Sequence, residues 1–125
     1  MDFCEQLPEG CPPAGAREIR EEREVYRLVR SNPPTESDFA SHRALYPRKY
    51  FRDECLARAL SVNDSVQSAR MTLKLPSMRD KALLVCRVRL LRGAGSILQT
   101  GGNSGHYSWW QARDFDPIKN SEVLS

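Results

Sequence analysis

The sequence has no long apolar run. No stretch of 18 apolar residues occurs in its 125 residues, so a membrane-spanning helix is not expected. The first 22 residues, MDFCEQLPEGCPPAGAREIREE, contain acidic residues and prolines but no apolar segment, and they do not resemble a secretion signal. Together these absences predict a cytoplasmic protein that has no membrane partner.

Metal-ligating residues are few. The chain has two histidines and four cysteines, Cys4, Cys11, Cys55 and Cys86, and no pair of cysteines has the C-x-x-C spacing of a zinc knuckle. We therefore expect no metal site. Reduced thiols follow from a cytoplasmic location, and the apolar surroundings of Cys55 and Cys86 predict that both pack as small apolar side chains.

Known catalytic and phosphate-binding motifs are also missing. The segment GAG at residues 93–95 lacks the context of a phosphate-cradling loop and is interpreted as a turn. No serine, histidine and acid have the spacing of a catalytic triad. Whether the protein is an enzyme stays open on these grounds.

Charge gives little evidence for a nucleic-acid partner. The net charge is +3, from 19 basic and 16 acidic residues, and the basic residues are dispersed along the chain rather than gathered in a stripe. Apolar residues make up 40% and charged residues 28%, which is typical of a globular domain.

Local patterns predict an α+β fold with a mostly antiparallel sheet of five or six short strands and two short helices in the first half. Residues 1–22 are expected to be a flexible N-terminal arm, and residues 23–125 a single domain. Alternating apolar residues predict strands at 24–30 and 81–91. Capping patterns predict helices at 35–45 and 63–75, with a possible helical turn at 53–58. Shorter extended segments are expected at residues 59–62, 96–100, 106–110 and 121–125.

The segment SGHYSWW, residues 104–110, is the richest in functional side chains. On a strand, Trp109 and Trp110 point to opposite faces, so we expect one indole in the core and the other exposed near His106. His106 is a candidate general base or donor to an anion. Tyr107 and Asn103 complete the candidate ligand or partner surface. The alternative is that both tryptophans simply pack against the sheet.

Two polar residues lie within predicted apolar strands. Arg27 alternates with valines in EVYRLVR, where an arginine either reaches the sheet edge or contacts an anion. Ser61 lies in ALSV, where a serine is commonly bonded to backbone. Both residues are candidate catalytic residues together with His106.

The order of these segments resembles the small ADP-ribosyltransferase-like domains, including RES-domain proteins. VYRLVR, a short helix, ALSVNDSVQSA and LLVCRVRL follow one another in a similar layout over residues 24–90. The resemblance implies NAD as ligand, with Arg27 at its phosphates or ribose and Ser61 at the position of the serine or tyrosine on the next strand. The late glutamate of those families has no clear counterpart, since Glu122 lies outside any motif, and the glycine-rich RES signature is absent.

Two classes of function follow. The first is an interaction or accessory module that uses the aromatic segment 104–110 to bind another protein, without a cofactor. The second is an enzyme, or a degenerate enzyme, that binds a nucleotide-like ligand such as NAD. The second predicts Arg27, Ser61 and His106 in one concave site, whereas the first predicts the tryptophan pair on an exposed patch.

Overall fold

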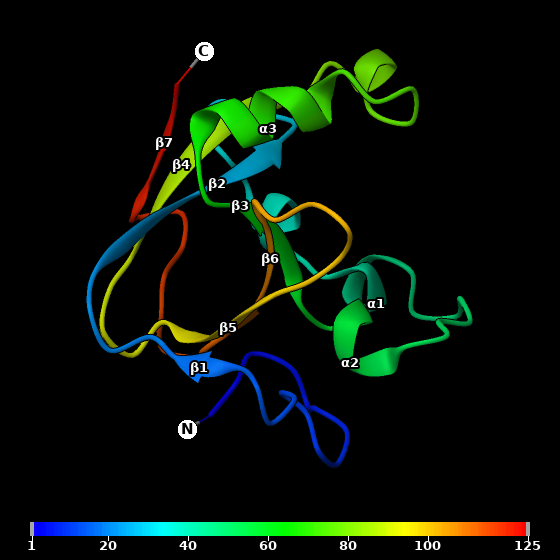
Figure 1. The fold of residues 1–125 in the computed structure, drawn as a ribbon, viewed down its shortest axis with the longest axis vertical. Helices are drawn as coiled ribbons and strands as arrows, with labels where there is room; N and C mark the ends of the chain where they lie inside the picture. Colours follow the sequence, from blue (N-terminus) through cyan, green and yellow to red (C-terminus); the bar gives the residue numbers. More distant parts are fainter. Residues whose placement is uncertain (1, 125) are drawn as a thin grey trace.

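The computed structural model describes residues 2–124, which contain one antiparallel sheet (Figure 1). Its seven strands have the spatial order β1-β5-β6-β3-β2-β4-β7. The strands are β1 (Arg17–Glu18), β2 (Arg23–Val29), β3 (Leu60–Asn63), β4 (Leu84–Leu90), β5 (Gly95–Gln99), β6 (His106–Gln111) and β7 (Ser121–Val123). The predicted α+β class with a mostly antiparallel sheet is therefore confirmed.

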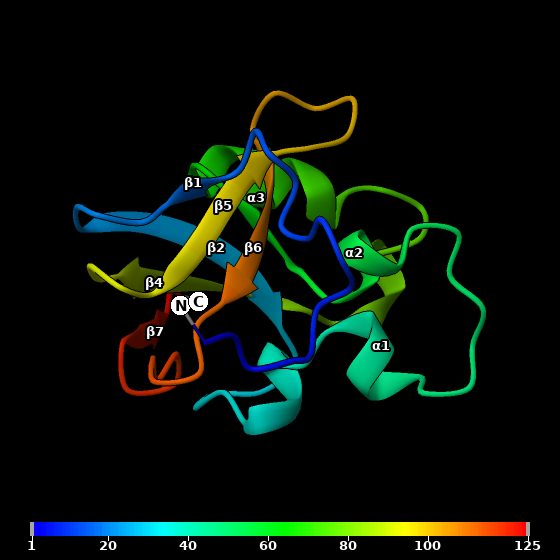
Figure 2. The same cartoon turned by 90° about the horizontal axis from the view of Figure 1, so that it is seen from below.

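Three α-helices and two 3-10 helices connect the strands in this part of the chain. They are η1 (Glu36–Phe39), α1 (His42–Leu45), α2 (Glu54–Ala57), α3 (Val66–Leu73) and η2 (Arg79–Lys81). Helix α3 packs on β2, β3 and β4, while α1 and α2 lie together beside the start of β3 (Figures 1 and 2). None of the helices between residues 2 and 124 combines the length and the apolar character needed to cross a membrane.

Three details of the sequence prediction are corrected. The sheet has seven strands rather than five or six, because the short β1, which lies in the predicted N-terminal arm, pairs with β5 at one edge. The expected helix at 35–45 is two short helices, since Ala40 adopts an extended conformation (φ −96°, ψ 141°) between η1 and α1. With α2 and α3, the α-helices number three rather than two in the described residues.

The core lies on one face of the sheet and follows the period-two pattern of the strands. Val25, Val62, Val88, Leu90 and Trp109 are each fully buried in one apolar cluster. Burial of side chains this large supplies most of the folding free energy of a domain of this size. A polar residue within these strands therefore costs folding free energy unless its polar atoms are hydrogen-bonded.

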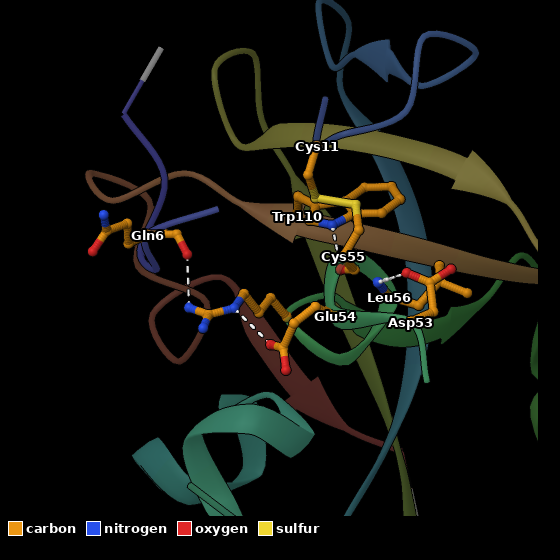
Figure 3. The surroundings of a disulfide bond; sticks show 8 residues. Gln6, Cys11, Asp53, Glu54, Cys55, Leu56 and Trp110 are labelled. Atoms are coloured by element: carbon orange, nitrogen blue, oxygen red, sulfur yellow. Dashed lines mark hydrogen bonds and ion pairs between the residues drawn. A yellow bond between two sulfur atoms is a disulfide. The ribbon is translucent and has the colours of Figure 1, made fainter. Parts of the chain in front are cut away.

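The N-terminal segment packs on the sheet. Phe3 forms a bridge with Ala112, β1 pairs with β5, and Ile19 is only 3% exposed in the core. Cys11 and Cys55 form a disulfide bond that joins this segment to α2 (Figure 3). The expectation that Cys55 packs as a reduced thiol is therefore wrong. Flexibility of residues 1–22 stays a prediction, although residues 2–22 contact the sheet at several places.

A buried carboxylate fixes η1 to the end of β2. Asp38 accepts hydrogen bonds from the Arg30 N–H (2.8 Å), the Ser31 hydroxyl (2.9 Å) and the Thr35 N–H (2.9 Å). Burial alone raises the pKa of Asp38, but these three bonds and the nearby charge of Arg27 outweigh it, so the pKa lies below its ordinary value. Ionised Asp38 thus stabilises the turn that follows β2.

Loss of the disulfide is expected to destabilise the fold. Cys55→Ser removes a cross-link between residues 44 positions apart, which we expect to lower the free energy of unfolding by roughly 2–4 kcal/mol. Urea unfolding of the oxidised proteins measures this difference. Cys4→Ser, at an exposed free thiol, is the matched control. Equal midpoints for the C55S variant and the wild type would contradict the prediction.

Removing the charge of Asp38 is expected to destabilise the protein at neutral pH. Asp38→Asn replaces an acceptor of three bonds by a group that can accept fewer, at a cost of about 1–3 kcal/mol. Because the folded-state pKa is depressed, this contribution is present above about pH 4 and is lost as the pH falls toward the folded-state value. Thermal unfolding at pH 7 and pH 3 should therefore show a difference between variant and wild type that shrinks at pH 3. A constant difference would contradict the assigned role.

Candidate functional site

The sheet splits between β2 and β3. Strand β2 pairs with β4 at seven positions, from Arg23 to Val29, but with β3 at only one, Tyr26 opposite Asn63. Past that pair the two strands separate, and the ladder hydrogen bonds between them are not formed. A polar group must satisfy the carbonyls left in such a gap.

Arg27 spans the gap with its guanidinium group. Its Nε donates to the carbonyl oxygen of Asp38 (2.7 Å), and its Nη1 donates to the carbonyl oxygen of Ser61 on β3 (2.7 Å). Desolvation lowers the pKa of Arg27 to about 10, against the opposing effect of the Asp38 carboxylate, so the side chain stays charged at neutral pH. The residue thus places a fixed positive charge in the middle of the sheet.

A hollow of about 270 Å³ opens at the split. Arg27, Arg30 and Lys81 bring three positive charges to its lining. The one carboxylate in that lining, Asp38, is already bonded to three donors. The hollow is therefore suited to an anion, since its cations outnumber its acid and the acid is satisfied within the protein.

A second hollow of about 330 Å³ adjoins the first. The two share three lining residues, His42, Ser61 and His106, and we call the two adjoining hollows together the cleft. The second hollow is less charged, and Phe51 and Leu56 contribute apolar surface to it. The first hollow thus carries most of the positive charge, and the second adds the aromatic ring of Phe51.

Hydrogen bonds orient the ring of His106 in the cleft. Its Nδ1 lies 3.1 Å from the carbonyl oxygen of Thr100, and the Thr100 hydroxyl lies 2.7 Å from that of Ser108. The same Nδ1 lies 3.2 Å from the Thr100 hydroxyl. A hydrogen on Nδ1 would serve the carbonyl, which only accepts, and would leave Nε2 as an acceptor. In that tautomer His106 can accept a hydrogen bond through Nε2.

The second histidine of the cleft is uncharged at neutral pH. His42 stacks on Phe51 with ring centroids 6.3 Å apart and an interplanar angle of 9°. Partial burial lowers the pKa of His42, and the positive charges of Arg27, Lys49 and Lys81 lower it further. At pH 7 the ring contributes a flat neutral surface between the two hollows.

The structure brings together the three residues proposed as catalytic. Arg27, Ser61 and His106 all line the first hollow, although they come from β2, β3 and β6. This is the arrangement that the second class of function predicts. No two of them have the geometry of a nucleophile bonded to a base. Arg27 bonds to the backbone carbonyl of Ser61 rather than to its hydroxyl, and the His106 ring bonds to Thr100.

The expectation that one tryptophan is exposed is wrong. Trp109 and Trp110 are both fully buried. The indole N–H of Trp109 donates to the carbonyl oxygen of Ala94 (3.0 Å), and that of Trp110 donates to the carbonyl oxygen of Cys55 (2.9 Å; Figure 3). The physical reason is that both faces of β6 are covered, one by the apolar core and the other by α2 and the N-terminal segment.

The two other aromatic-segment candidates lie outside the cleft lining. Tyr107 packs against the core, with the guanidinium of Arg23 5.3 Å from its ring centroid. Asn103 is exposed, and its side chain accepts a hydrogen bond from the Gly105 N–H within the turn before β6. A binding role for either residue stays a prediction.

Several residues of the cleft were not predicted from the sequence as site residues. Asp38 was visible only as a helix-capping acid, and nothing in the sequence brings Asn63 or Lys81 to Arg27. Glu122 lies on β7 and pairs with Arg87, outside the cleft. In residues 2–124 no three histidine, cysteine or acidic side chains gather as a metal ion would require.

Comparison of the chain with protein-family models, with curated proteins and with solved structures finds no match. The site therefore has to be interpreted from its own chemistry.

Proposed function

We propose that the cleft binds a nucleotide-like anionic ligand such as NAD or ADP-ribose. The observation that carries this proposal is the convergence of Arg27, Ser61 and His106 on one hollow in which cations outnumber the acid. Guanidinium groups suit phosphate oxygens, and the adjoining hollow offers flat and apolar surface for a ring. The layout resemblance to ADP-ribosyltransferase-like domains is consistent with the same ligand class.

Each cleft residue has a role in this proposal. Arg27 and Arg30 would neutralise the phosphates, and Lys81 would add charge at the opening of the first hollow. His106, with its hydrogen on Nδ1 toward the Thr100 carbonyl, would accept a hydrogen bond from a ribose hydroxyl through Nε2. His42 and Phe51 would supply flat surface in the second hollow.

Binding without group transfer is the form of the proposal that the residues favour. The cleft linings include two carboxylates, Asp38 and Asp53. Asp38 holds three donors, and Asp53 accepts the Leu56 N–H at 3.1 Å as the N-cap of α2. Neither resembles the free glutamate that transfer chemistry of this type uses, which suits a degenerate, ligand-binding member of the class.

The interaction-module hypothesis loses its main support, because both indoles of segment 104–110 are buried. A protein partner at this segment and a cytoplasmic location both stay predictions.

Isothermal titration with NAD, ADP-ribose, AMP and pyrophosphate tests the ligand class. We expect saturable binding of ADP-ribose, and a loss of roughly tenfold or more in affinity for Arg30→Gln and for Lys81→Gln, since each removes a charge-assisted contact. Both side chains are exposed, so these variants should fold. His106→Gln should weaken binding of ADP-ribose but leave that of pyrophosphate unchanged.

Arg92→Gln, in the exposed turn between β4 and β5, is the matched control and should bind as the wild type does. The absence of heat with all four ligands, or equal affinity in the Arg30, Lys81 and Arg92 variants, would refute the proposal.

A further inference from the structure

The loop at residues 46–52, between α1 and α2, combines basic and aromatic side chains. Its sequence is YPRKYFR, and no aspartate or glutamate occurs anywhere in residues 40–52. Tyr50 is 84% exposed and Tyr46 is 48% exposed, the two most exposed aromatic side chains among the large hydrophobic residues of the described surface. Two tyrosine rings thus face solvent within one strongly basic segment.

Contacts within this aromatic–basic loop hold a cation against ring faces. The Nζ of Lys49 lies 5.7 Å from the ring centroid of Tyr46 and 5.5 Å from that of Phe51. Arg43 lies 4.7 Å from the Phe51 centroid and pairs with Glu54 at the start of α2. These cation–π contacts limit the freedom of the loop, so its charges are partly preorganised.

The remaining cations of the loop face solvent. Arg48 and Arg52 are exposed, and within residues 2–124 neither forms an ion pair. Two arginines without an acidic partner repel each other and attract a polyanion.

The loop is continuous with the cleft. Phe51 and Arg52 belong to the lining of the second hollow, and Leu45, just before the loop, belongs to that of the first. Arg27 and Lys81 line the first hollow. Positive charge therefore continues from the exposed loop into the split of the sheet.

We propose that the aromatic–basic loop and the adjoining cleft opening form a binding surface for single-stranded nucleic acid. Tyr50 stacks on a base, and Arg48 and Arg52 neutralise the flanking phosphates. Alternating ring faces and cations are what a single strand requires, because each nucleotide presents one flat base and one negative charge. A duplex hides its bases, and α1 has only four residues, too few for a groove-reading helix.

The other polyanions fit these features less well. An acidic peptide would use the cations but would gain little from two exposed tyrosine rings. An anionic membrane would be expected to require an amphipathic helix, whereas this surface is a loop between two helices of four residues. The inference does not depend on the proposed ligand of the cleft, because Tyr50 and Arg48 line neither hollow and Arg52 alone is shared with the second.

Fluorescence anisotropy of the full chain with fluorescein-labelled dT12 and rU12 tests the proposal. We expect saturable binding at low salt. Tyr50→Ala should weaken it roughly 5- to 150-fold, the effect of losing one stacked base, while Tyr50→Phe should keep the wild-type affinity. In the double variant Arg48→Gln/Arg52→Gln, the slope of log affinity against log salt should become shallower by about 1.4.

Arg89→Gln/Arg92→Gln is the matched control, because it removes the same charge near the turn between β4 and β5, far from α1 and α2 (Figures 1 and 2). It should change neither the affinity nor the salt slope. Titration of ADP-ribose into the Tyr50→Ala variant separates the two proposals, since its affinity for that ligand should equal that of the wild type.

Three results would overturn the inference. The first is that neither strand binds. The second is that the loop and control double variants weaken binding equally, which would mean that the strands are attracted by net charge alone. The third is binding to a poly-glutamate peptide or to phosphatidylserine vesicles as tight as to the strands, with Tyr50→Ala unchanged.

Discussion

The guanidinium group of Arg27 is the contact on which the arrangement of the cleft depends. It occupies the place where ladder hydrogen bonds between β2 and β3 would otherwise form, and it bonds instead to the carbonyls of Asp38 and Ser61. One charged side chain thus keeps two strands apart and satisfies the backbone that their separation leaves unpaired. An arginine between Val25 and Val29 is costly, and the anion site that we propose would account for it.

The opposite wall of the cleft depends on a second set of contacts (Figure 3). The Cys11–Cys55 disulfide and the hydrogen bond from Trp110 to the Cys55 carbonyl hold α2 against β6. Arg58, just after α2, donates to the Gln6 carbonyl. Helix α2 in turn places Leu56 and Ala57 along the second hollow. The tryptophans of the aromatic segment therefore contribute to the site indirectly, because Trp110 supports this wall.

Local patterns predicted every strand except β1, and they predicted helix α3, because each of these elements depends on neighbouring residues. Alternation identified 24–30 and 81–91, and the side-chain cap of α3 at Ser65 was visible in the sequence. Long-range pairing was not predictable in this way. The disulfide, the burial of Trp110 under α2 and the basic loop beside the cleft all depend on segments far apart in the chain. Arg27 stood out only because a charge among valines needs a physical reason.

Hydrogen–deuterium exchange with and without saturating ADP-ribose tests the central claim most directly, namely that the split between β2 and β3 is the ligand site. The account predicts slower exchange in η1, in β3 and at residues 100–106, with little change in β7 and in the turn between β4 and β5. Protection confined to β7 or to that turn, or no protection in η1 and β3 under saturating ligand, would contradict it.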